Sequence, residues 1–327
     1  MNTLLFGIIF ISPPIIKKWI LRWFCGGRFG CHSSIGWFSA VIGSRIEIGN
    51  YSHIKPFTLI RCSGEVKLGE YTEISSFSIV YGCGNFIVGD KCYIGPQTWI
   101  NVSEDVVIGH GVGIGPRTMI FTHGSFLPYT QGGPVRFGKI IIGNNVWIAA
   151  GVFIHPGVKI GDNVLVNSRS VIKKDISSGQ YVEGFPAKEI RPMNEICHPV
   201  NLADRDDLIM NVLRHFRSFL QNTKKQIHHI EGEDRFFSIR YHRRDYLVVL
   251  VDYRGTVSLD LQTLAKKRMI VLLNRINWIP PFEGDQILVF NFLTMKTKYS
   301  KDKIHQEIYQ FMKMYYGIIF EYNEISL

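Results

Sequence analysis

The sequence lacks the features of several protein classes. No apolar run reaches the ~20 residues that a membrane-spanning helix needs, because Pro13 and Pro14 interrupt the stretch that begins at Leu4. No positive charge precedes that stretch and no small-residue cleavage site follows it, which argues against a signal peptide. The six cysteines form no Cys-x-x-Cys pair, so we expect reduced thiols in a cytoplasmic protein.

Acidic residues are fewer than basic residues. The 327 residues include 27 Asp and Glu against 37 Lys and Arg, which gives a formal charge of +10. This balance favours an anionic partner: nucleic acid, an acidic membrane face or a phosphate-rich cofactor. Composition alone does not choose among them. An apolar content of 46% is that of a packed globular protein, and the length allows two ordinary domains.

The N-terminal segment, residues 1–30, is apolar and basic. Its stretch Ile15–Phe24 (IIKKWILRWF) predicts an amphipathic helix. Such a helix suits two roles, lying on a membrane surface or capping the end of a β-structure, and the sequence favours neither.

A repeat of six residues follows this segment. Within each unit of about 20 residues, aliphatic side chains recur at intervals of six, and aliphatic–glycine pairs mark the start of each unit. Amphipathic helices do not repeat at six, and strand alternation alone would not keep glycine in phase. The pattern predicts a coil of three short strands a turn, whose aliphatic side chains fill a continuous core. The pairs are Ile48-Gly49, Leu68-Gly69, Val88-Gly89, Ile108-Gly109 and, after a gap, Ile142-Gly143.

The glycine of each pair is expected at a tight corner, because glycine adopts positive φ without the steric cost that a Cβ brings. A 20-residue coil is then three hexapeptides with two extra residues at one corner, whereas coils 142–159 and 160–177 have the bare 18. The repeat is interrupted between Ile120 and Ile142, where the glycine- and proline-rich stretch 121–139 reads as a loop ejected from the coil. Long loops in compact domains are commonly functional.

The repeat ends near Ile190, and residues 200–327 predict a separate α+β domain of unknown role. Asp204 and Asp207 are typical of a helix start, and an apolar face follows. Strand-like runs begin at Phe236, Tyr246, Met269 and Gln286, and a last helix is expected at 301–316. His228 and His229 follow a basic stretch (Lys224, Lys225) and are expected to be solvated.

The last coils resemble a known family. The stretch 140–192 contains IGNNVWI, HPGVKIGDNV, KKDI and GFPAKEIR, and it is similar to the closing coils of the hexapeptide-repeat acetyltransferases. The most similar subgroup is that of the maltose, galactoside and capsule-sugar O-acetyltransferases. The resemblance covers about Ile35 to Pro192. It implies a mainly β fold, a left-handed parallel β-helix over 31–195, and a homotrimer with each active site between two neighbouring prisms.

The resemblance also implies a catalytic histidine. The family's general base lies at the start of the ejected loop, which is where THG places His123. It takes a proton from the acceptor hydroxyl as that oxygen attacks the thioester, with no covalent intermediate. An imidazole with an ordinary pKa of about 6.5 is neutral yet basic at working pH. Asn101 matches a family asparagine that orients the acceptor or stabilises the oxyanion. An asparagine ladder inside a β-helix is the structural alternative for Asn101.

The cofactor implied by the resemblance is acetyl-CoA, as a co-substrate. Two groups of residues match the family's binding positions. One group meets the pantetheine arm and the other lies near the nucleotide end, where cations suit the phosphates. A solvated turn is the alternative for Lys173 and its neighbour Lys174. The first group is Ala150 and Ser168, and the second is Lys173, Lys188 and Arg191. Trp147 matches the tryptophan of the family's Val-Trp pair and is also expected to bind the cofactor.

Four departures from the family pattern concern the donor site. Ala149 stands where glycine is usual, and His155 replaces an asparagine. Asn167 and Arg169 replace glycines, so Arg169 either narrows the pantetheine channel or adds a phosphate contact. Gly124, where proline is frequent, follows His123. We expect His155 to be a surface or trimer-contact residue and not a second base.

Three other functions compete with O-acetylation. A zinc enzyme of the β-helical carbonic anhydrase type needs three convergent histidines, and His110, His123 and His155 lack the close His-x4-His pair. A non-catalytic trimeric scaffold would only display the C-terminal domain. N-acylation of an amino sugar, often a nucleotide sugar, differs only in the acceptor.

The function predicted from the sequence is transfer of an acetyl group from acetyl-CoA to a hydroxyl of a sugar or surface-polysaccharide precursor. We expect no metal and no nucleic acid partner. The expected location is the cytoplasm, with peripheral contact at the inner membrane face.

Overall fold

The computed structural model describes residues 3–125, 127–223, 227–241, 244–254, 268–278 and 287–323. The chain divides into two compact units, Met1–His198 and Pro199–Leu327. The expected strand start at Gln286 and the basic residues Lys224 and Lys225 lie outside the described residues, as do the side chains of His228 and His229.

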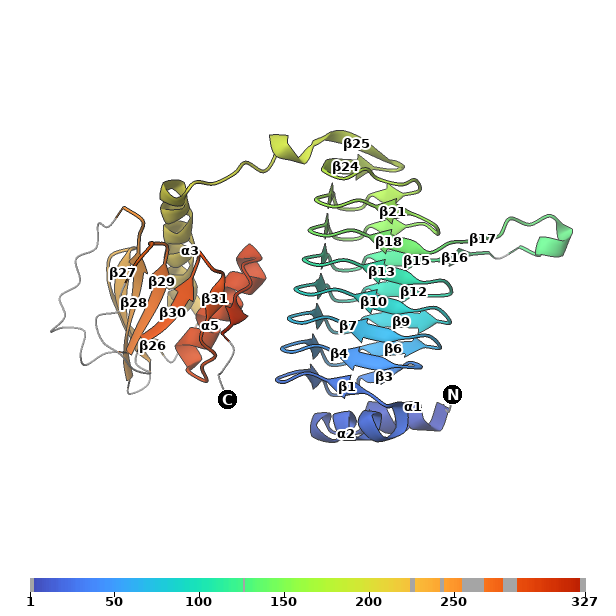
Figure 1. Ribbon diagram of the computed structural model, residues 1–327, viewed down its shortest axis with the longest axis horizontal. Helices are drawn as coiled ribbons and strands as arrows, with labels where there is room; N and C mark the ends of the chain where they lie inside the picture. Colours follow the sequence, from blue (N-terminus) through green and yellow to red (C-terminus); the bar gives the residue numbers. More distant parts are fainter. Residues whose placement is uncertain are drawn as a thin grey trace. The chain divides into compact units, whose positions relative to one another are not determined.

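The first unit is a parallel β-helix in which a coil contributes one short strand to each of three sheets (Figure 1). Sheet A consists of β1 (Arg28–Phe29), β4 (Ile46–Ile48), β7 (Val66–Leu68), β10 (Phe86–Val88), β13 (Val106–Ile108), β18 (Ile140–Ile142) and β21 (Lys159–Ile160). Sheet B consists of β2 (Ser34–Ile35), β5 (His53–Ile54), β8 (Glu73–Ile74), β11 (Tyr93–Ile94), β14 (Gly113–Ile114), β19 (Trp147–Ile148), β22 (Leu165–Val166), β24 (Gln180–Gly184) and β25 (Ala187–Pro192). Sheet C consists of β3 (Ala40–Ile42), β6 (Leu59–Cys62), β9 (Ile79–Gly82), β12 (Trp99–Asn101), β15 (Met119–Phe121), β20 (Phe153–Ile154) and β23 (Val171–Ile172).

The predicted fold class is confirmed. Every aliphatic side chain of the six-residue series, from Ile48 to Ile172, is at most 2% exposed and belongs to one continuous core. Parallel pairing aligns Val66, Phe86 and Val106 at offsets of 20, and Ile141 pairs with Lys159 at an offset of 18. Each coil buries its aliphatic residues only against its neighbours, so stability accumulates coil by coil.

The prediction that the paired glycines adopt positive φ is wrong. Positive φ occurs two residues later, at Tyr51 (54°), Tyr71 (54°) and Lys91 (55°). The glycines are required for a different reason, close packing between coils. A Cβ on Gly69 would lie 2.5 Å from the Gly89 carbonyl carbon and 2.3 Å from Asp90 Oδ1, well inside van der Waals contact.

The stretch 121–139 leaves the coil as a hairpin, which projects away from the stacked coils in Figure 1. Its stem pairs β16 (His123–Gly124) with β17 (Arg136–Phe137) in antiparallel fashion, and a 3-10 turn, η1 (Tyr129–Gln131), lies in the outer part. The chain returns at Gly138, whose N–H donates to the Thr122 carbonyl at 2.9 Å. Sequence patterns indicated a loop here but not its strand pairing.

Two helices pack on the first coil. The expected helix is α2 (Pro14–Cys25), which contacts β2, and α1 (Thr3–Ile11), which was not expected, contacts β3. Ile9, Ile20 and Leu21 enter the β-helix core, so these helices cap its end. No helix among the described residues is long and apolar enough to cross a membrane.

The second unit is α+β. Its helices α3 and α5 share an apolar core with the strands, including Phe216, Val248, Ile270 and Ile308. Asn201 Oδ1 accepts from the Asp204 N–H, so the first helix begins slightly before the expected aspartates. A short 3-10 turn, η2 (Met193–Glu195), precedes the unit. The elements are α3 (Leu202–Thr223), β26 (Ile227–Gly232), β27 (Phe236–Tyr241), β28 (Arg244–Val251), β29 (Arg268–Leu273), β30 (Ile287–Asn291), β31 (Lys296–Thr297), α5 (Lys303–Tyr316) and β32 (Glu321–Tyr322), with the strands in that order in one sheet.

Candidate active site

Five of the eight predicted site residues lie at two corners of the coils. The C–A corner follows each strand of sheet C, and the B–C corner precedes it. His123 follows β15 at the C–A corner, whereas Ala150 and Ser168 precede β20 and β23 at the B–C corner. The two groups therefore lie at opposite ends of the sheet C strands within one chain.

The hairpin stem positions His123. Its backbone pairs with Phe137, and the two rings lie 4.3 Å apart between centroids with a 30° tilt. The return of the chain is held by the Gly138–Thr122 bond and by the Gly157 N–H, which donates to the Gly138 carbonyl at 3.0 Å. A Cβ on Gly138 would lie 2.5 Å from Gly157 Cα, so the returning strand packs directly against the next coil. His123 is half-buried and shielded on one side by Phe137.

Asn101 lies one coil before His123, at the same corner. Its strand β12 pairs with β15, which places Asn101 opposite Phe121. The buried Thr122 hydroxyl lies 3.0 Å from both the carbonyl oxygen and Oδ1 of Asn101. The Ser103 N–H also donates to Asn101 Oδ1, at 3.3 Å. The side-chain oxygen is thus engaged, and among the described residues the Nδ2 group of Asn101 forms no hydrogen bond, so its donors remain available to a substrate.

Two further predicted residues share this corner in the next coils. His155 follows β20 and Lys173 follows β23. The pKa of His155 is lowered by partial burial, and the Lys173 and Arg136 charges lower it further. Lys173 Nζ lies 5.3 Å from the centroid of the exposed Phe185 ring, a cation–π contact. Burial and these two charges therefore favour the neutral form of His155.

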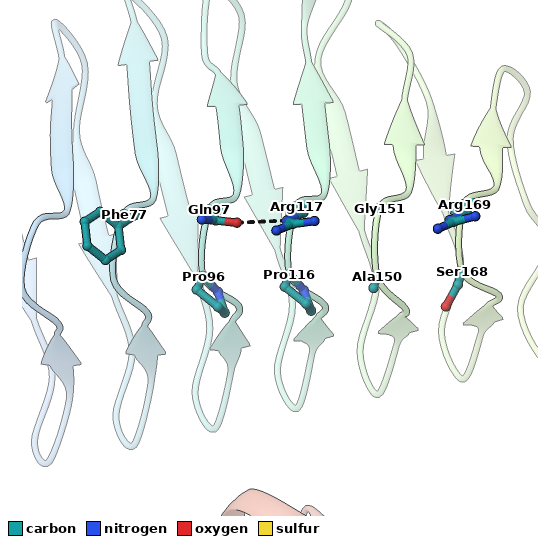
Figure 2. Close-up of a pocket in the computed structure, with 9 residues that line it drawn as sticks. All are labelled: Phe77, Pro96, Gln97, Pro116, Arg117, Ala150, Gly151, Ser168 and Arg169. Atoms are coloured by element: carbon teal, nitrogen blue, oxygen red, sulfur yellow. Dashed lines mark hydrogen bonds between the residues drawn. The ribbon is translucent and has the colours of Figure 1, made fainter.

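A groove of about 700 Å³ follows the B–C corner (Figure 2). The predicted residues Ala150 and Ser168 line it, and Figure 2 shows them in a row with side chains of the preceding coils. Two arginines, Arg117 and Arg169, stand in the parallel row, and Arg117 Nε donates to Gln97 Oε1 at 2.8 Å. The groove thus combines apolar walls with two exposed cations, a combination that suits a pantetheine arm and phosphates.

The other predicted cofactor residues lie outside this groove. Trp147 is on β19 of sheet B and its side chain is 61% exposed. Lys188 and Arg191 are on β25, at the last edge of sheet B, and the Arg191 guanidinium lies 5.6 Å from the Tyr181 ring centroid. The structure therefore unites His123 with Asn101, and Ala150 with Ser168, but does not join these pairs within one chain.

Within one chain, the three histidines of the zinc alternative do not come together. His110 follows β13 at the corner between sheets A and B, where its Nδ1 lies 3.1 Å from Asp90 Oδ2. His123 and His155 are at the C–A corner, so the three histidines do not converge. In the described part of the chain no cluster of three or more His, Cys, Asp or Glu is arranged to hold a metal ion.

Sequence reasoning missed three contributors to the site: Thr122, Phe137 and Arg117. Thr122 precedes the predicted base directly, so its position alone could have indicated it. Phe137 becomes the neighbour of His123 only through the pairing register of the hairpin. Arg117 and Arg169 occupy equivalent positions of the B–C corner in their coils, and each has a φ of 59°. That equivalence could have been predicted from the coil lengths.

The comparisons with known proteins agree with the repeat. Residues 139–174 match the model of the bacterial transferase hexapeptide (six repeats) family. The chain is 42% identical over 65 residues to galactoside O-acetyltransferase of Escherichia coli K12, covering 20% of this chain and 32% of that protein. It is 45% identical over 56 residues to chloramphenicol acetyltransferase of Morganella morganii, covering 17% and 27%. The chain thus spans about a third of the length of these curated relatives, and the expected resemblance is confirmed over this segment.

Two solved structures are also similar. A maltose O-acetyltransferase from Clostridium difficile 630 is 20% identical, covering 58% of this chain and 82% of that chain at a TM-score of 0.33. An N-acyltransferase from Bacillus cereus, in complex with dTDP-4-amino-4,6-dideoxyglucose and coenzyme A, is also 20% identical, covering 54% and 91% at a TM-score of 0.40.

Proposed function

We propose that this protein transfers an acetyl group from acetyl-CoA to a hydroxyl of a sugar or surface-polysaccharide precursor, with His123 as general base. The observation that carries the proposal is the hairpin stem. It fixes the backbone of His123 against Phe137, at the same corner as Asn101, whose Nδ2 donors form no hydrogen bond among the described residues. The chain that supplies this corner also contains the transferase hexapeptide repeat at residues 139–174.

In this reaction the neutral imidazole of His123 removes the proton of the acceptor hydroxyl while that oxygen attacks the thioester carbonyl. The Nδ2 donors of Asn101 orient the acceptor or stabilise the negative oxygen of the tetrahedral intermediate. His123 then returns the proton to the departing thiolate sulfur. No covalent enzyme intermediate forms, so no nucleophilic Ser or Cys is needed.

Acetyl-CoA would lie in the B–C groove, where Ala150 and Ser168 meet the pantetheine arm. Of the two roles expected of Arg169, we propose the phosphate contact, because Arg169 and Arg117 both line the groove. Lys173, Lys188, Arg191 and the exposed Trp147 bind the remainder of the cofactor.

A homotrimer completes the site. His123 and the groove lie at opposite ends of sheet C within one chain, so one copy presents His123 to the groove of its neighbour. Sheet C also presents Trp99 and Met119 outward, 48% and 42% exposed, as an apolar face between the two corners. Burial of such a face against a neighbour is favourable at about 25 cal/mol per Å².

N-acylation of an amino sugar is the alternative. It uses the same donor site and base, and it differs only in the nucleophile.

The direct test is an acceptor screen. The full chain is incubated with acetyl-CoA and a panel of sugars with free hydroxyls or free amines, and released thiol is measured. We expect thiol release with hydroxyl acceptors and a product, separated from acetyl-CoA, that alkaline hydroxylamine cleaves, since it is an oxygen ester. A hydroxylamine-resistant product would move the assignment to N-acylation. Absence of both acetyl-CoA binding and acceptor-dependent thiol release would contradict the proposal.

A further inference from the structure

Large apolar side chains are exposed on both N-terminal helices. On α1, Leu4, Ile8 and Ile11 are 70%, 43% and 66% exposed, at the i, i+4, i+7 spacing of one helix face. On α2, four side chains project outward together, and the rings of Trp19 and Trp23 stack at 6.0 Å. Large apolar side chains exposed together on the helices that cap the β-helix mark an interaction surface. The α2 side chains are Ile15 (90%), Ile16 (46%), Trp19 (63%) and Trp23 (75%).

The orientation of α2 is fixed by a buried lysine. Lys17 has no exposed surface, and its Nζ donates to the carbonyls of Gly36 and Ser39, each at 2.7 Å. Ile20 and Leu21 enter the core beside it. Because 100° separates successive helical residues, this anchoring turns Trp19 and Trp23 away from the β-helix. Their exposure is thus a consequence of the packing on the first coil.

The charge around the patch has one sign. Residues 1–46 contain Lys17, Lys18, Arg22, Arg28 and Arg45 but no Asp or Glu. Lys17 is buried, Lys18 is half-buried, and Arg22 and Arg28 are exposed. Tryptophans with adjacent basic residues are typical of helices that lie in the interface of an anionic bilayer.

We propose that the outward face of α1 and α2 docks this end of the β-helix onto an anionic lipid bilayer. Trp19, Trp23 and Ile15 enter the headgroup boundary, while Lys18 and Arg22 contact the lipid phosphates. The helices do not cross the bilayer. The sequence left membrane contact and capping as alternatives for α2; the structure assigns them to opposite faces of the same helix and adds α1 to the docking face.

The sharpest test is vesicle flotation of the full chain. Vesicles of phosphatidylcholine alone are compared with vesicles containing roughly 30% phosphatidylglycerol at low and physiological salt. We expect flotation only with the anionic vesicles, and weaker flotation as salt screens the charges. Lys18→Gln with Arg22→Gln should reduce the partition coefficient by an order of magnitude or more, since each basic residue near the surface contributes roughly fivefold.

Two variant pairs distinguish a contribution of the α1 and α2 face from non-specific binding through exposed apolar side chains. Trp19→Gln with Trp23→Gln removes exposed rings, so we expect an intact fold and at least tenfold weaker binding. Phe236→Gln with Met314→Gln removes comparably exposed apolar side chains of the second unit, 41% and 57% exposed, and should leave binding unchanged. Equal loss in both pairs would overturn the proposal.

Two other outcomes would also contradict it. The first is equal binding to neutral vesicles, which would remove the role of the charges. The second is concentration-dependent self-association that the Trp19 and Trp23 substitutions abolish without any vesicle binding, which would assign the face to a second copy of this chain. Flotation does not depend on the transfer reaction, so its failure is distinct from failure of the acetyltransferase proposal.

Discussion

At the scale of the residue, Thr122 links the two catalytic candidates. It is fully buried, its hydroxyl lies 3.0 Å from Asn101 Oδ1, and its oxygen accepts from the Glu104 N–H at 3.0 Å. The residue after it is His123. The orientation of both the Asn101 amide and the start of the hairpin thus depends on one hydroxyl group.

Thr122→Val tests this link. Valine keeps the shape but leaves the Glu104 N–H without its acceptor, and Asn101 Oδ1 keeps only the Ser103 N–H. An unsatisfied buried polar group costs about 1–3 kcal/mol. We expect a lower free energy of unfolding in urea by about that amount, and a reduced kcat as Asn101 loses its orientation. Thr118→Val, at a buried threonine four residues earlier, is the matched control. An equal loss of kcat in the control would show that Thr122 has only a structural role.

His305 makes the second unit sensitive to acid. Burial lowers its pKa to about 4, from the ordinary 6.5, and its ring stacks on Phe290 at 4.5 Å. Between pH 6.5 and 4 the unfolded chain binds a proton at this residue that the folded chain does not, so stability falls as pH falls.

We therefore expect the free energy that protects the α5 amides from hydrogen exchange to fall by about 2 kcal/mol between pH 7 and pH 5. The reason is that pH 5 lies roughly 1.5 pH units below the pKa of His305 in the unfolded chain. The measurement is hydrogen exchange of α5 peptides, corrected for intrinsic rates. His305→Gln should flatten this slope. A wild-type slope of zero over the same range would contradict the account.

Much of the site could be predicted from the sequence, because the repeat fixes the position of each residue within its coil. His123 lies three residues past the in-phase Ile120, and Asn101 lies one 20-residue coil before Phe121, so both reach one corner. The contact with Phe137 could not be read, because it depends on where the chain re-enters the coil. The separation of His123 from Ala150 could not be predicted either, because it depends on the positions of the strands. A resemblance identifies matching residues but not the corner at which each one lies.

At the scale of the element, the coil depends on glycines that no other residue can replace. Gly69 shows this clearly, because a Cβ there would lie 2.5 Å from the backbone of the next coil. Its backbone φ is not in the left-handed region, so the constraint is space and not conformation.

Gly69→Ala should therefore destabilise the β-helix by about 2–4 kcal/mol, the range of a severely overpacked core site. Thermal unfolding of the full chain measures the change. Gly7→Ala is the control: no atom lies within 4 Å of its Cβ position, and alanine favours a helix, so stability should be unchanged or slightly higher. Equal effects of the two substitutions would refute the packing explanation.

The strand positions of the first unit were predictable because a period of six is sustained over many coils. The second unit was predictable only as elements, such as the helix that ends at Gly317 with φ of 65°. Its sheet order depends on pairings between distant segments, and no local pattern encodes those. The helix α1 was missed because its residues are apolar on every side and show no amphipathic period.

At the scale of the whole molecule, the site is proposed to form between copies. Complementation tests this arrangement. His123→Ala removes the base, and Ala150→Trp blocks the groove, so each variant alone should be inactive. In trimers refolded from an equal mixture, His123 and the groove come from different chains, and about a quarter of the sites should have both intact. Recovery of about a quarter of wild-type activity is expected, whereas no recovery would place both elements in one chain.

The central claim is that His123 is the general base of acetyl transfer. The measurement is kcat for acetyl-CoA-dependent thiol release with the best acceptor, for wild type, His123→Ala and His155→Ala. We predict a loss of 10²–10⁴-fold for His123→Ala, the usual contribution of a general base, with little change in acetyl-CoA binding. His155→Ala, one coil further along the same corner, should stay within a few-fold of wild type. An undiminished kcat for His123→Ala would contradict the account.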